Sequence, residues 1–69
     1  MSDHIYKKIE LVGSSRNSVE DAIQNAISMA DKSLEHLDWF EVQEVRGDIH
    51  DGKVGYYQVS LKVGFRLND

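Results

Sequence analysis

The spacing of apolar residues changes twice along this 69-residue chain, and the two changes constrain its fold. Apolar residues alternate with a period of two over residues 4–12, recur at steps of three and four over 18–37, and alternate again from 39 to 67. Alternation is typical of a half-buried strand, and steps of three and four are typical of an amphipathic helix. The order strand, helix, strand, strand predicts one α+β domain, residues 1–69, with one long helix on one face of a three-stranded antiparallel sheet.

The helix prediction rests on start signals as well as on periodicity. Asn17 and Ser18 are both good N-cap residues, and each has an acid three residues later, Glu20 or Asp21. No Gly or Pro interrupts residues 18–37, so the helix is expected to span that range. Its apolar stripe comprises Val19, Ala22, Ile23, Ala26, Ile27, Ala30, Leu34 and Leu37.

The dipeptide Asp51-Gly52 predicts the turn of a β-hairpin, because a type I′ turn needs positive φ at both central residues. A two-residue loop there places Phe40 opposite Val63 on the helix-facing side. It also places Glu41 opposite Lys62 on the other side, where the acid and base are expected to pair. Matched apolar and charged partners support this register.

The face of the sheet away from the helix, here called the reverse face, carries unexpected aromatic residues. In the predicted register Trp39 lies there opposite Gly64, which leaves a flat patch, with the Gln58 amide further along the same face. Tyr56 and Val45 are expected on this face too. Such a surface suits a planar heteroaromatic ring that bears donors and acceptors. The residues alone favour packing against a neighbouring subunit, because aromatics are common at oligomer contacts.

Composition narrows the function classes. The chain has no Cys, which excludes disulfides and thiolate metal sites, so oligomerisation is the expected extra source of stability for so small a core. A net charge of −4 without a basic stripe argues against nucleic-acid binding. No apolar run approaches the roughly 20 residues of a membrane span. The polar start of the chain argues against a signal peptide, so a cytoplasmic protein is expected.

The sequence contains no clear motif for catalysis or for metal binding. The three histidines form no ligand cluster, and residues 48–51 are expected to be a solvated hairpin tip. No serine has a recognisable base partner, and Glu41 and Glu44 are expected on opposite sides of their strand. Residues 13–16 precede a helix but lack the ending of a P-loop. We therefore assign no catalytic residue and no metal ligand.

Several strings of the sequence together resemble the dodecin family, and most closely its bacterial branch. They are YKKIELVGSS at 6–15, HLDWFEV at 36–42, EVRG at 44–47, YQV at 57–59 and VGFRL at 63–67. The resemblance covers nearly the whole chain and keeps the order strand, helix, strand, strand, with a tryptophan just after the helix.

The resemblance implies a non-enzymatic flavin store that assembles as a hollow homododecamer and quenches flavin photochemistry. Flavin pairs would lie between tryptophans of neighbouring subunits, with Trp39 stacked on the isoalloxazine and Gln58 bonded to its polar edge. Arg46 matches an arginine near the flavin site of bacterial members. The predicted register places Arg46 opposite Tyr57 on the helix-facing side. It would therefore reach the flavin only through a bulge at Gly47 or around a subunit edge.

The implied cofactor is FMN, with riboflavin and FAD as alternatives, and some family members bind coenzyme A. A coenzyme A-binding variant is accordingly one alternative function. The other is a structural oligomer or small enzyme in which the reverse face makes subunit contacts only.

Overall fold

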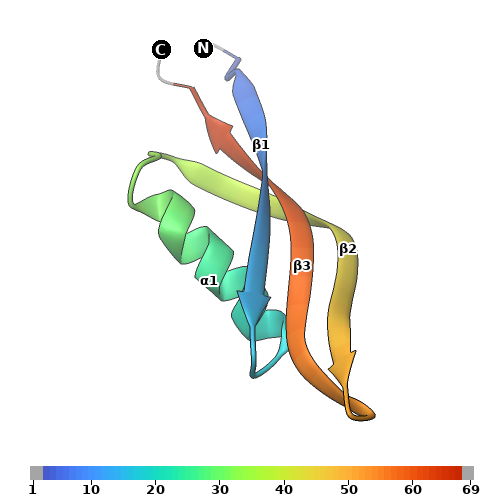
Figure 1. The fold of residues 1–69 in the computed structure, drawn as a ribbon. Helices are drawn as coiled ribbons and strands as arrows, with labels where there is room; N and C mark the ends of the chain where they lie inside the picture. Colours follow the sequence, from blue (N-terminus) through green and yellow to red (C-terminus); the bar gives the residue numbers. More distant parts are fainter. Residues whose placement is uncertain (1–2, 68–69) are drawn as a thin grey trace.

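The computed structural model describes residues 3–67, so the first two residues of the polar start lie outside it. The chain forms β1 (Tyr6–Ser15), α1 (Val19–Asp31), β2 (Leu37–His50) and β3 (Lys53–Arg66). The strands form one antiparallel sheet in the order β1-β3-β2, with α1 against one face (Figure 1). The predicted α+β architecture is therefore confirmed.

The helix begins as predicted but ends early. The side chain of Ser18 caps it by accepting a hydrogen bond from the backbone N–H of Asp21 at 3.0 Å. The helix then ends at Asp31, not at residue 37, and Leu37 is the first residue of β2. The chain reverses through a turn in which His36 has a positive φ of 62°. No Gly or Pro marks that turn, and the spacing of Leu34 and Leu37 continues the helical period past it.

The core is small and centred on β3. The largest fully buried side chains of the described residues are Val59, Leu61 and Val63, which pack against Ala22 and Ala26 of α1. The helix covers β1 and β3, and the hairpin turn projects beyond it (Figure 1).

The helix-facing side of β2 remains largely uncovered. Phe40 and Val42 lie on it and are 47% and 43% exposed. Such apolar area in a chain of this size is available for contact with other subunits.

The hairpin turn and both ends of its register are as predicted. Asp51 and Gly52 have φ of 52° and 74°, as a type I′ turn requires. Trp39 pairs with Gly64, and Phe40 pairs with Val63.

The middle of the register is shifted by one residue, which corrects the position of Arg46. A bulge between Val42 and Glu44 leaves Gln43 unpaired, and a second shift between Asp48 and Ile49 restores the predicted pairing near the turn. Arg46 therefore pairs with Gln58, not Tyr57, and lies on the reverse face. The predicted bulge at Gly47 is wrong in position, although a bulge does redirect the arginine.

The same shift moves two other side chains. Val45 pairs with Val59 on the helix-facing side, so the prediction that it lies on the reverse face is wrong. Glu44 pairs with Ser60 and joins Glu41 on the reverse face, so the two acids share a face, contrary to the prediction.

Candidate functional site

Trp39 lies on the reverse face, where β2 holds it against Gly64 of β3. A methyl group at Gly64 would overlap the six-membered ring of Trp39, at nearly equal separations from Cε2, Cζ2 and Cη2. Near-equal separation from three consecutive ring atoms means that Gly64 lies beneath the ring face, not at its edge. The opposite face of the indole therefore points away from the sheet, and the residue is 37% exposed.

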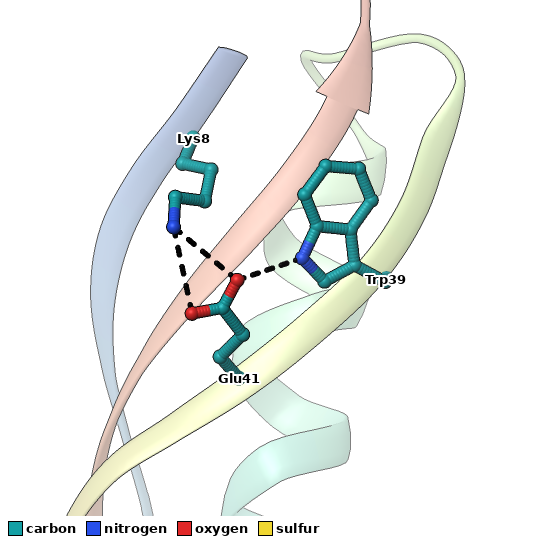
Figure 2. Close-up of polar contacts among 3 residues, drawn as sticks. All are labelled: Lys8, Trp39 and Glu41. Carbon is teal, nitrogen blue, oxygen red and sulfur yellow. Dashed lines mark hydrogen bonds and ion pairs between the residues drawn. The ribbon is translucent and has the colours of Figure 1, made fainter. Parts of the chain in front are cut away.

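Neighbouring side chains hold the edge of the indole. The Nε1–H of Trp39 donates to Oε2 of Glu41 at 2.9 Å. Lys8 Nζ lies 3.3 Å from the same oxygen, and the Tyr6 ring meets the indole edge-on at 5.4 Å between centroids. Figure 2 shows the three polar groups side by side over the strands. We call Trp39, Gly64, Glu41 and Lys8 the indole site.

The ion pair of the indole site differs from the predicted one. Lys62 stands opposite Glu41 in the register, but the carboxylate binds Lys8 of β1 instead. Lys8 pairs with Gly64 of the central strand, over which the indole lies. The Glu41 carboxylate extends from β2 over β3 and meets Lys8 Nζ on the β1 side (Figure 2).

These contacts lower the pKa of Glu41. The hydrogen bond from Trp39 has the largest effect and that from Lys8 the next, while desolvation acts in the opposite direction. Since the pKa is lower in the folded than in the unfolded chain, the contacts stabilise the fold above the unfolded pKa. Their contribution is lost as the pH falls through the folded pKa.

We expect acid titration of the ligand-free protein to change the fluorescence of Trp39, with a midpoint below the ordinary pKa of glutamate. Protonation removes an acceptor from the indole N–H and weakens the attraction to Lys8. Trp39 is the only tryptophan, so its emission reports on this site alone. Glu41→Gln should abolish the transition; the same midpoint in that variant would assign the titration to another group.

A second cluster, the amide site, lies at the other end of the reverse face. Arg46 donates through Nε to Oε1 of Gln58, and its Nη1 donates to Oε1 of Glu44 at 3.1 Å. Because the carbonyl oxygen of Gln58 accepts from the arginine, its NH₂ group remains available as a donor. Gln58 also borders a shallow hollow of about 310 Å³, together with Ser14, Ser15, Arg16 and Tyr56.

The structure brings Gln58 and Arg46 together but does not bring Trp39 to them. Gln58 and Gly64 are six residues apart on β3, which corresponds to roughly 20 Å at about 3.3 Å per residue. A single tricyclic ring does not span that distance. Within one chain, the predicted residues therefore form two separate sites on the same face.

Sequence reasoning missed the role of Lys8 and the contact of Glu44 with Arg46. The signal for Lys8 was its register against Gly64, which becomes visible only when β1 is aligned with β3. The contact of Glu44 depends on the bulge at Gln43, for which no Gly or Pro gives a signal.

The described residues contain neither a metal-ligand cluster nor a membrane-crossing helix. Within residues 3–67, no group of three or more His, Asp or Glu side chains is arranged to hold a metal ion. His50 and Asp51 contact each other at 3.6 Å at the exposed hairpin tip. Over the same residues, no helix has the length and apolar character needed to cross a membrane.

A family model, a relative of known sequence and two solved structures all match nearly the whole chain. The family model described as Dodecin matches residues 5–68. The dodecin of Thermus thermophilus is 57% identical over 65 residues, which is 94% of each chain. The crystal structure of the tt0972 protein from Thermus thermophilus superposes with a TM-score of 0.93 at 55% identity, covering 97% of this chain and 98% of that one. The dodecin of Streptomyces davaonensis gives a TM-score of 0.93 at 48% identity, covering 99% of this chain and all of the other.

Proposed function

The chain belongs to the dodecin family, and from this we propose that it binds flavin, with FMN as the favoured ligand, on the exposed face of Trp39. The proposal rests on the position of the Trp39 indole: one face of the ring packs on Gly64 and the other points away from the sheet. A flat, electron-rich surface of this kind binds a planar heteroaromatic ring by stacking. The Nε1–H of Trp39 is already bonded to Glu41, so the ligand meets the π face.

The flavin site requires more than one copy of the chain. Gln58 and Arg46 lie roughly 20 Å along the sheet from the indole, so the amide that contacts a stacked ring comes from another subunit. The NH₂ group of Gln58 would donate to a carbonyl oxygen on the polar edge of the isoalloxazine. The small core and the exposed apolar side of β2 support assembly, which we propose is a homododecamer with flavins held between tryptophans of neighbouring subunits.

The proposed role is storage and protection, not catalysis. An indole in van der Waals contact with an excited flavin can donate an electron and regain it, which quenches the excited state without net reaction. Sequestration of this kind needs a stacking surface and no acid, base or nucleophile. The reverse face offers such a surface, and its charged groups at the two sites are engaged in holding Trp39 and Gln58.

A fluorescence titration tests the proposal. Purified protein at micromolar concentration should quench the emission of added FMN, and light scattering should show an oligomer with and without the ligand. Unchanged FMN emission would reject flavin binding. A monomer that still quenched FMN would reject the shared site.

A Gln58→Ala variant is expected to bind FMN about fivefold more weakly, which corresponds to the loss of one hydrogen bond worth about 1 kcal/mol. The measurement is the same fluorescence titration. Gln24→Ala is a matched control, since the amide of this α1 residue bonds to Ser28 of the same helix, away from the reverse face. A loss larger than that of a Trp39→Ala variant would make the amide, not the indole, the principal contact.

A further inference from the structure

An exposed tryptophan on a strand has several accessible rotamers, and stacking on it costs the entropy of fixing one of them. In this chain the indole is already fixed before a ligand arrives. Gly64 supports its face, and Glu41 holds its N–H. We propose that Glu41 is the positioning residue of the flavin site, and that Lys8 holds the Glu41 carboxylate in place. The inference rests on the proposed function, because it names what prepares that site for its ligand.

Contacts between side chains link all three strands near Gly64 on the reverse face. Trp39 and Glu41 are two residues apart on β2 and share the reverse face. The carboxylate accepts from the indole through Oε2 and lies within reach of Lys8 through both oxygens, at 3.3 and 3.5 Å (Figure 2). Lys8 comes from β1, and the Glu41 carboxylate reaches it over β3 (Figure 2). Each group therefore limits the rotation of the next.

The charges around Glu41 explain why Lys8 matters to it. On the reverse face, Lys62 stands between two acids, with Glu41 on one side and Glu10 on the other. Lys8 stands opposite Gly64 and contacts Glu41. Removal of Lys8 would leave Glu41 to share Lys62 with Glu10, and the carboxylate would no longer be drawn toward the indole. Helix α1 lies on the other face and supplies no charge here.

The first test uses ligand-free protein and the single indole. We expect the Nε1–H of Trp39 to exchange slowly with solvent in the natural chain, measured by nuclear magnetic resonance, and quickly in Glu41→Ala. Glu41→Gln retains an acceptor oxygen and should be intermediate. Glu10→Gln is the matched control, because it removes the same charge from the same face without a contact to Trp39. Equal exchange in Glu41→Ala and the natural chain would overturn the proposal.

The second test measures FMN affinity in the same variants. Glu41→Ala should bind about tenfold more weakly, as expected for a lost hydrogen bond to a charged group. Lys8→Met should weaken binding less, and Glu10→Gln should bind as the natural chain does. Fast indole exchange with unchanged FMN affinity would overturn the positioning role.

The two tests distinguish a failure of the proposed flavin binding from a failure of the positioning role of Glu41. If the natural chain bound no FMN, the proposed function would be rejected, and the inference that rests on it would fall too. The exchange measurement would then still decide whether Glu41 fixes the indole. If the natural chain bound FMN, only the behaviour of Glu41→Ala and Lys8→Met would decide the inference, and flavin binding itself would stand.

Discussion

A Trp39→Ala variant is expected to lose roughly 5- to 150-fold in affinity for FMN, since stacking of a base-like ring on one aromatic side chain contributes about 1–3 kcal/mol. The effect should be the largest of any single truncation on the reverse face. The indole offers a flat surface open to solvent, and its hydrogen bond to Glu41 already holds it in one orientation. Secondary structure should remain intact, because Trp39 lies outside the buried core.

Three measurements are needed to interpret the result for the Trp39→Ala variant. Circular dichroism checks the fold, light scattering checks assembly, and FMN fluorescence gives the affinity. Trp39→Phe is the matched variant, since it keeps a π face but loses the N–H bonded to Glu41; its affinity should lie between those of Trp39→Ala and the natural chain. Equal FMN binding by Trp39→Ala, with loss of the oligomer, would show that the indole serves assembly instead.

The sequence was sufficient for the parts of the fold that depend on local signals. Alternation indicated the strands, and Asp51-Gly52 indicated the turn and the pairing of Phe40 with Val63. The bulge at Gln43 could not be predicted, because the second shift at Asp48 compensates for it. Two opposite shifts leave both ends of a hairpin matched, so apolar pairing at the ends cannot reveal them. The correct face for Arg46 depended on that hidden shift.

The end of the helix was missed for a similar reason. Leu34 and Leu37 continue the spacing of the apolar stripe, although the helix has ended at Asp31 and Leu37 lies in β2, beyond the turn at His36. Leu37 packs against the core from the strand. A buried position can thus match the helical period while belonging to a different element.

The candidate site was predicted in part. Trp39 opposite Gly64 follows from the hairpin alone and is confirmed. The contact of Glu41 with Lys8 was missed because β1 joins the sheet through α1, and a connection through a helix does not fix the register of a strand as a short turn does. The separation of the indole site from the amide site follows from counting residues along β3. That distance is the physical reason why the proposed flavin site needs a second copy of the chain.

A Gly64→Ala variant is expected to weaken FMN binding about 10- to 100-fold, which is close to the effect of removing the indole. The reason is that the added methyl group would occupy the space that the six-membered ring of Trp39 fills. The ring must swing away from Gly64, and it then loses the hydrogen bond to Glu41 and the edge contact with Tyr6. The fold itself should persist, since the overlapping atoms belong to an exposed side chain and not to the backbone. Fluorescence titration with FMN measures the loss.

A double-mutant cycle separates this mechanism from a general disturbance of β3. In the Trp39→Ala background the methyl group at residue 64 meets no indole, so Gly64→Ala should have no further effect on FMN affinity. It should also raise the free energy of unfolding by about 0.5–1 kcal/mol there, because glycine in a strand costs conformational entropy. In the natural background the same substitution should lower or leave unchanged that free energy, measured by urea denaturation. A stabilising effect of equal size in both backgrounds would show that the ring does not rest on Gly64.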